Sequence, residues 1–277
     1  MSQSSKLFVV MLVCAFAAAN AQAGTLSFKF NLGGTYLIGG DYNKTMNGWR
    51  DYEQTVLEPT ETFTDNLKKL GLGFQGSVEA IYELSPRLGV GIEAGYLGAT
   101  VTSGFSRTWN DYHMTETPRL SGVPLLLNVH YTLPLSGPWK LQVTAGGGIL
   151  LTHLELDYNY ENLTLPYHGT WIAENQTTPV FKAGFGLEYA LSNTIALTFD
   201  LFGRYAEIKD LTGEYSGVFN GSPYSGTATA YYYDLVGTYP WLVLYADPPS
   251  SANAENVRTA VFSFSGLSAL FGVRITI

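Results

Sequence analysis

Cysteine is nearly absent from this chain: its 277 residues include only Cys14, which lies near the N-terminus. Residues 1–23 have the features of a cleavable secretory signal peptide, with a positive start at Lys6, an apolar stretch and a small-residue cleavage site before Gly24. A membrane helix is the alternative interpretation, but the apolar stretch is shorter than the roughly 20 residues that a helical span needs. The mature chain, residues 24–277, would contain no cysteine, which excludes disulfide bonds and thiol chemistry.

Positive charge and long apolar runs are also scarce. Lys and Arg number 15 against 23 Asp and Glu, which gives a formal net charge of −8. Because the chain has no basic patch, we do not expect it to bind nucleic acid. No stretch of about 18 apolar residues follows residue 23, so we expect no helical membrane span. No cofactor is predicted either, because the run Gly146-Gly147-Gly148 lacks the lysine of a phosphate-binding loop.

What the chain has in abundance is a two-residue alternation of apolar with small or polar side chains. In residues 70–84, for example, Leu72 and Phe74 alternate with Gly73 and Gln75. A period of two over this length predicts a strand with one apolar and one polar face. Strands in soluble domains average about 5–6 residues, whereas strands of about 9–11 tilted residues cross a bilayer in β-barrels.

Eight segments share this alternation, and the connections between them alternate between short and long. Bacterial membrane barrels have this arrangement, with short periplasmic turns and long external loops. The sequence therefore predicts an all-β fold, an eight-stranded antiparallel up-and-down transmembrane β-barrel with four long extracellular loops. The predicted spans are residues 26–38, 70–84, 88–102, 123–133, 139–151, 180–191, 195–205 and 261–277. The short connections are 85–87, 134–138 and 192–194, and the long ones are 39–69, 103–121, 152–179 and 206–260.

The longest connection, residues 206–260, contains three further alternating segments at 214–219, 227–233 and 241–245. We expect them to form a hairpin that extends the barrel above the membrane. A ten-stranded barrel is the alternative. It would require another tight turn between two full spans, and the sequence of this connection does not provide one.

Residues 26–277 resemble the small eight-stranded outer-membrane barrels, the group of the OmpA transmembrane domain, OmpX and the opacity-type surface proteins. Residues 85–96, SPRLGVGIEAGY, are similar to the first periplasmic turn and third strand of that group. Residues 272–277, GVRITI, are similar to its C-terminal strand signal, although the chain ends on Ile277 where the group usually has an aromatic residue. The resemblance implies location in the bacterial outer membrane, contact with its lipid and lipopolysaccharide, and recognition by the barrel-assembly machinery through the last strand.

The polar faces of the predicted spans point into the barrel and carry charges of both signs. An eight-stranded barrel is just wide enough for side chains to fill it, and an unpaired charge away from water is very costly. We therefore predict a plugged lumen with an ion-pair network, centred on Arg274 with Asp200 and either Glu93 or Glu79. Inward glycines would make room for the long side chains. A gate that opens when one pair switches is the alternative to a static polar core. The predicted network consists of Lys29, Glu79, Glu93, Lys182, Glu188, Asp200, Arg204 and Arg274.

The surplus negative charge falls in the long connections, which are also rich in Tyr and Trp. Residues 152–179 contain four acidic residues and no Lys or Arg, which makes them the best candidate for a divalent-cation site, with plain solvation as the alternative. The aromatic residues suit an adhesive surface and equally suit packing of the loops against one another. The candidate cation site consists of Glu155, Asp157, Glu161 and Glu174.

These features favour a structural or surface-interaction protein that uses its loops for adhesion, for envelope integrity or for binding a host or cell-surface ligand. A narrow passive channel for small or apolar solutes, similar to the OmpW-like porins, is the alternative. A loop-borne hydrolase is more remote, because it would require a His/acid cluster at the outer rim, for which Asp111, His113, His153 and His168 are the available residues. We expect no enzymatic activity.

Overall fold

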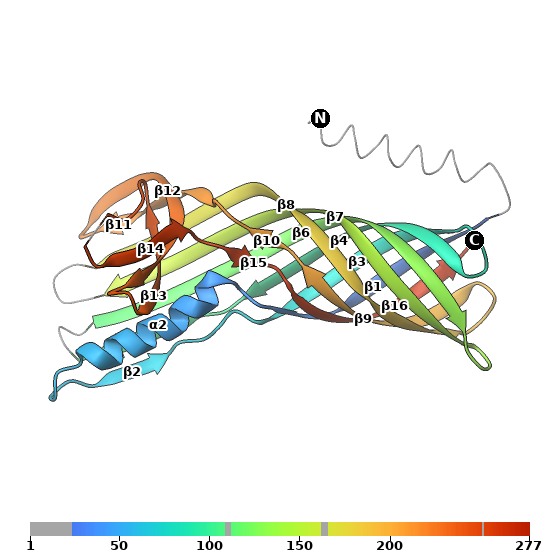
Figure 1. Ribbon diagram of the computed structural model, residues 1–277, viewed down its shortest axis with the longest axis horizontal. Coiled ribbons are helices and arrows are strands. Elements are labelled where there is room, and N and C mark those ends of the chain that lie inside the picture. The colour runs from blue at the N-terminus through green and yellow to red at the C-terminus, as the bar shows by residue number, and fades with distance from the viewer. Residues whose placement is uncertain (1–23, 109–111, 162–165, 251) are drawn as a thin grey trace.

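The computed structural model of the chain describes residues 24–108, 112–161, 166–250 and 252–277, so the predicted signal peptide lies outside the described residues. Eight antiparallel strands pair in a closed ring, in the order β1–β3–β4–β6–β7–β8–β9–β16, and β16 pairs back with β1 (Figure 1). These strands are β1 (Thr25–Leu37), β3 (Leu72–Glu83), β4 (Leu88–Thr100), β6 (Tyr112–Pro134), β7 (Trp139–Glu161), β8 (Tyr167–Ala190), β9 (Ile195–Tyr205) and β16 (Gly266–Thr276).

The short turns lie at the end of the barrel where the chain ends (Figure 1). Serine side chains form two of them locally. The Ser85 hydroxyl accepts hydrogen bonds from the backbone N–H groups of Arg87 and Leu88, and the Ser192 hydroxyl does the same for Thr194 and Ile195. Because such serine turns depend only on neighbouring residues, they can be recognised from the sequence.

The predicted antiparallel barrel is confirmed, but the described chain contains more strands than the eight predicted. The described parts of the four long connections contain further strands and a helix, and they build a folded head beyond the barrel (Figure 1). We define the head as the extended ends of β6, β7 and β8 together with the following elements: α2 (Asp41–Val56), β2 (Phe63–Asn66), β5 (Ser103–Arg107), β10 (Glu207–Ile208), β11 (Thr212–Phe219), β12 (Ser222–Leu235), β13 (Tyr239–Tyr245), β14 (Ala254–Thr259) and β15 (Phe262–Ser263).

The three extended strands keep their alternation but exchange the character of their two faces. On β7, the outward side chains Ile149 and Leu151 are apolar and exposed, whereas the next two outward residues are His153 and Glu155. The inward residues change in the opposite sense, from Gln142 in the barrel to the buried Leu150, Leu154, Leu156 and Tyr158. The register between β7 and β8 also shifts at Thr152/His153. The outward face therefore changes from lipid-compatible to water-compatible here, and the inward face becomes a hydrophobic core.

The head is a curled sheet whose two edges are bridged by a helix. Its strands are ordered β2–β5–β6–β7–β8–β11–β12–β13. Helix α2 lies between the edge strands β2 and β13: Arg50 forms an ion pair with Asp65 on β2 at 2.7 Å, and Trp49 packs edge-to-face on Trp241 of β13. The helix approaches β13 so closely that a Cβ atom at Gly48 would lie 2.1 Å from the Pro240 carbonyl oxygen. The helix thus closes the upper sheet without backbone pairing.

The helix is the only one in the described part of the chain, and it is not long and apolar enough to cross a membrane.

The segments predicted at 214–219, 227–233 and 241–245 correspond to β11, β12 and β13. Strand β11 pairs with the outer half of β8, so this hairpin extends the sheet beyond the barrel as expected. The last predicted span began too early, at residue 261, because β16 begins at Gly266. The preceding residues belong to the head: Phe262 lies on β15, and Phe262 and Phe264 are buried in its core.

Aromatic packing holds the head together, as one of the two interpretations of the aromatic residues expected. Trp49, Tyr158, Trp171 and Tyr232 belong to the buried core. The Tyr167 ring stacks on Tyr158 and on Tyr224, with centroids 5.1 Å and 5.2 Å apart. Much of the aromatic content of the predicted loops therefore packs the head internally. Trp109 lies outside the described residues.

Trp171 provides a test of this packing, because it is fully buried and its indole N–H donates a hydrogen bond to the Ala228 carbonyl at 3.1 Å. We expect Trp171→Ala to lower the free energy of unfolding of the head by about 3–5 kcal/mol, since it leaves a large cavity. Proteolysis of the refolded protein at increasing urea concentration measures this. Ile172→Ala, on the opposite face of the same strand, is the control and should change little. Equal sensitivity of the two variants would contradict the assigned core.

Candidate functional site

The inward face of the barrel collects charged side chains from seven of its eight strands, and this lumen was the predicted site. At the turn end, the Arg274 guanidinium on β16 contacts Glu83 on β3 and Glu188 on β8, the latter at 3.1 Å. Lys140 on β7 reaches the same Glu188 at 3.4 Å, and Arg274 also donates to the Ser27 hydroxyl. Two cations and two carboxylates thus close the lower end of the lumen.

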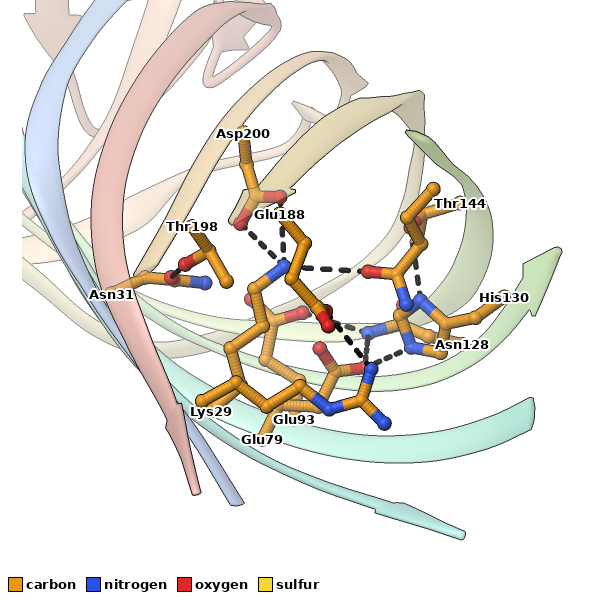
Figure 2. A network of polar contacts seen from close by, with 12 residues as sticks. Lys29, Asn31, Glu79, Glu93, Asn128, His130, Thr144, Glu188, Thr198 and Asp200 are labelled. Carbon is orange, nitrogen blue, oxygen red and sulfur yellow. Dashed lines mark hydrogen bonds and ion pairs between the residues drawn. The ribbon is translucent and has the colours of Figure 1, made fainter. Parts of the chain in front are cut away.

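A second group of charges lies deeper in the barrel (Figure 2). Lys29 on β1 contacts Asp200 on β9 at 2.7 Å, and Lys182 on β8 contacts Glu93 on β4. The remaining carboxylate, Glu79 on β3, is 2.7 Å from His130 Nε2. These side chains are almost fully buried. Ionised groups in such an enclosure must satisfy one another, because there is no bulk water to solvate them.

Neutral polar groups bind the two halves of this second group together. The Asn128 amide on β6 donates to Glu79 at 2.6 Å and to Glu93 at 2.8 Å (Figure 2). His130 contacts Thr144 through its other ring nitrogen. Sequence alternation places Asn128 and His130 inside the barrel but does not identify them as partners of the carboxylates. Glu83 and Lys140 are likewise inward residues that the predicted network of eight did not include.

Arg204 on β9 has neutral partners. Its guanidinium donates to Gln75 at 2.8 Å, to the Thr35 hydroxyl at 3.1 Å and to the Phe264 carbonyl at 2.9 Å. It thereby joins the upper barrel wall to the segment that leads into β16.

The structure brings all eight predicted network residues to the lumen but corrects the expected centre. Arg274 does not contact Asp200, Glu93 or Glu79; its carboxylate partners are Glu83 and Glu188. The reason is strand stagger: the residue facing Arg274 on β9 is Ala196, four residues before Asp200 along that strand. The sequence prediction compared the depths of residues in the barrel by counting from the turn ends, and this counting neglects the stagger between strands.

Charged and amide side chains of the network fill the space beside the inward glycines, as expected. A Cβ atom at Gly91 would lie 2.3 Å from Glu79 Oε1, and one at Gly146 would lie 1.9 Å from Asn128 Oδ1. A Cβ at Gly186 would lie 2.2 Å from Asp200 Oδ1. The small residues of the inward face therefore set the space that the network occupies.

The space left among the central charges is very small. The cavity lined by Lys29, Glu79, Glu93 and Lys182 measures about 20 Å³, which is room for about one water molecule. Above it, the inward residues Leu97, Leu150 and Leu270 are fully buried, and the head core follows. The lumen is filled by charged side chains in its lower part and by apolar side chains in its upper part.

The predicted cation site is not formed. Glu155 and Asp157 both contact Arg119 of the neighbouring strand β6, at 2.6 Å and 2.5 Å, and Glu174 contacts His153. The absence of Lys and Arg from residues 152–179 was misleading because cross-strand pairing supplies a cation from another segment. Glu161 lies at the end of β7, opposite His113. No group of three or more His, Cys, Asp or Glu residues suited to a metal ion occurs in the described ranges.

The histidines considered for a hydrolase lie on different strands. His153 contacts Glu174 at 3.3 Å and Glu155 at 3.8 Å, on half-exposed side chains of the outer face. His113 lies on β6 and His168 on β8, where it faces Val218 of β11. Asp111 lies outside the described residues.

One carboxyl is buried in the core of the head. Glu116 on β6 accepts a hydrogen bond from the Tyr160 hydroxyl at 3.1 Å and faces Ser103 of β5. Burial raises the pKa of Glu116 to about 8, and the Tyr160 hydrogen bond opposes this rise only in part. Burial, together with the nearby carboxylates of Glu53 and Glu116, raises the pKa of Tyr112 to about 12. Glu116 is therefore held as a neutral acid among tyrosines at mildly acidic pH.

A family comparison agrees with this architecture. Residues 8–220 match the model of a family described as outer membrane protein beta-barrel domain. The chain belongs to this family. The protein is thus an outer-membrane β-barrel, in line with the resemblance of its sequence to the small outer-membrane barrels. A search of curated proteins finds no match.

Solved structures similar to this barrel come from several bacteria. A major outer membrane protein of Thermus thermophilus has 17% identity and a TM-score of 0.42, with 92% of this chain and 100% of that chain covered. The outer membrane protease OmpT of Escherichia coli has 8% identity and a TM-score of 0.45, with 94% and 100% covered. OprG of Pseudomonas aeruginosa has 12% identity and a TM-score of 0.32, with 94% and 98% covered.

Glu116 makes the stability of the head depend on pH. The folded head holds a proton up to a pKa of about 8, whereas the unfolded chain releases it near the ordinary carboxyl value. Between these values the folded state binds more protons, so its free energy of unfolding decreases as the pH rises from about 5 to about 8. The contribution is fully present at lower pH, where both states are protonated.

We expect Glu116→Gln to flatten this pH dependence by up to a few kcal/mol. Urea unfolding of the head at several pH values, with susceptibility to proteolysis as the readout, measures this pH dependence. Glu214→Gln, which changes an exposed carboxylate on β11, is the matched control. The assignment would be disproved if, over the same pH range, the free energy of unfolding of the wild-type head increased relative to that of the Glu116→Gln variant.

Proposed function

We propose that this protein is a non-conducting, non-enzymatic scaffold of the outer membrane that presents its head at the cell surface as an interaction module. The observation that carries the proposal is the filled lumen. Charged side chains from non-adjacent strands of the ring contact one another and leave a cavity of about 20 Å³ between them. Apolar side chains then close the upper barrel. An aqueous pathway would have to break both layers.

The orientation follows from the lengths of the connections. Outer-membrane barrels have short periplasmic turns and longer extracellular segments. The head of this protein is built from the long connections, so it faces the exterior. Its elements are held together by pairing of β5 with β6 and of β11 with β8, and by a shared core. A rigid, folded head of this kind supports recognition, because little conformational entropy is lost when it binds.

Two hairpin tips of the head expose apolar side chains. Phe219 precedes the Asn220-Gly221 turn and is 45% exposed, and Val236 in the Val236-Gly237 turn is 57% exposed. Val236 has a φ of 54°, a left-handed conformation that β-branched residues rarely adopt. Backbone strain of this kind is found at functional positions. Here the strained backbone holds a valine side chain in solvent, which supports a contact role for these tips.

Planar-bilayer recording of the refolded mature chain tests the closed lumen. We expect no steady conductance from the wild type, because no water-filled path crosses the two layers of side chains. Insertion is verified independently by the heat-modifiable mobility of the folded barrel and by protease protection of its strands. Steady conductance that a solute blocks would overturn the proposal and identify a narrow channel instead.

The tip variants test the interaction role separately. Val236→Asn should leave the head as stable or stabilise it by up to about 1 kcal/mol, because Asn tolerates this backbone conformation. Combined with Phe219→Ser, it should nevertheless reduce the adhesion of cells that display the protein to an apolar surface such as polystyrene.

The matched control for adhesion is Leu135→Ser, which removes a similarly exposed apolar side chain at the opposite end of the barrel. Urea unfolding and surface display are measured for every variant. Adhesion that is equal in the tip variant and in the control would contradict the role of the tips.

A further inference from the structure

A cavity of about 510 Å³ opens on the outside of the molecule where the barrel meets the head. It lies between the start of α2, the segment that follows β9 and the segment that leads into β16. These three segments meet here because β1 and β9 end, and β16 begins, at the rim of the barrel. On the other side of the ring, β6, β7 and β8 continue past the rim into the head (Figure 1). The cavity is therefore a product of the unequal strand lengths.

The lower edge of the cavity belongs to the lipid-facing surface. Ile38 follows β1 and Tyr205 ends β9, and both continue the outward apolar face of their strands. Their exposed fractions are 54% and 56%. The next outward position after Tyr205 is Glu207, whose carboxylate accepts a hydrogen bond from the Tyr205 hydroxyl. The apolar face thus ends at the cavity, which places the opening at the level of the outer-leaflet headgroups.

The upper part of the cavity is basic, although the chain as a whole is acidic. Lys44, Lys69, Lys209 and Arg258 line it, together with only two carboxylates, Asp41 and Glu207. The Asp41 carboxylate is buried and already occupied: it binds Arg258 through two hydrogen bonds, Lys44 at 3.0 Å and the backbone N–H of Val261. These contacts hold Arg258 and Lys44 in place at the wall.

Lys69 and Lys209 have no such partner. Both side chains are exposed, and no ion pair or side-chain hydrogen bond reaches either ammonium group within the described ranges. The cavity therefore presents two uncompensated positive charges beside two fixed ones. A phosphorylated headgroup satisfies such an arrangement, because its oxygens accept several charge-assisted hydrogen bonds at once. Its acyl chains would continue along the apolar face below Ile38 and Tyr205.

We propose that this cavity binds the phosphorylated headgroup of a glycolipid of the outer leaflet. The bound lipid would bridge the barrel wall and the base of α2, with Lys69 and Lys209 reaching its phosphate. The site is independent of the lumen and of the hairpin tips, so it extends beyond the scaffold role proposed above. Attraction of anionic lipid to basic side chains near the membrane surface is the physical basis.

The test is a titration in neutral detergent of the refolded full mature chain with fluorescent bisphosphorylated lipid A. Fluorescence polarisation is the readout of binding. Lys69→Gln combined with Lys209→Gln should weaken binding by about tenfold or more, because two charge-assisted contacts are lost. The matched control is Lys68→Gln combined with Arg87→Gln. This control removes the same charge from exposed positions that do not line the cavity and should bind as the wild type does.

Two further probes identify the source of the phosphate. Dephosphorylated lipid A should bind the wild type as weakly as bisphosphorylated lipid A binds the cavity variant, and inorganic phosphate should compete only weakly because it lacks acyl chains. The proposal is overturned if the cavity variant and the control bind lipid A equally. It is also overturned if inorganic phosphate displaces lipid A completely at comparable concentration, which would indicate a site for free anions. Unchanged heat-modifiable mobility confirms that each variant is folded.

Discussion

Closure of the strand ring by the pairing of β1 with β16 is the constraint on which the rest of the structure depends. Because every strand of the ring has two neighbours, its backbone hydrogen bonds are satisfied without water, which makes it compatible with lipid. The same closure encloses the polar face in a narrow space. Charges there can be accommodated only as contacts such as Lys29 with Asp200 and Arg274 with Glu188. A filled lumen follows from the backbone topology and the charge pattern together.

The exchange of faces on β6, β7 and β8 explains how one chain serves two environments. Below the exchange, apolar residues face lipid and charges face each other; above it, polar residues face water and an apolar core lies inside. Helix α2 completes this upper layer by bridging β2 and β13. The head is thus an extension of the barrel with reversed polarity, and its core also seals the lumen. The filled lumen and the folded head have the same structural cause.

The positions of the eight spans could be predicted from the sequence because alternation, serine and glycine turns, and connection length are local properties. β9 has the predicted bounds, and β1 and β4 differ from them by only one or two residues. The head could not be predicted in the same way. On β7, for example, the apolar side chains beyond residue 152 occupy the opposite face, so a search for a continuous lipid-facing stripe ends the strand there. The inward positions of Leu154 and Leu156 are the signal in the sequence that marks its continuation.

The sequence by itself determined which residues face the lumen, since alternation within a strand fixes the direction of each side chain. It therefore placed all eight network residues inside. Only the tertiary structure decided their partners, because the stagger of neighbouring strands sets which depths coincide. Arg274 consequently meets Glu83 and Glu188 in place of Asp200. In the same way, cross-strand pairing gave Glu155 and Asp157 to Arg119, and unequal strand lengths created the basic cavity between α2 and β9. These features depend on contacts between residues far apart in the chain, which no local pattern encodes.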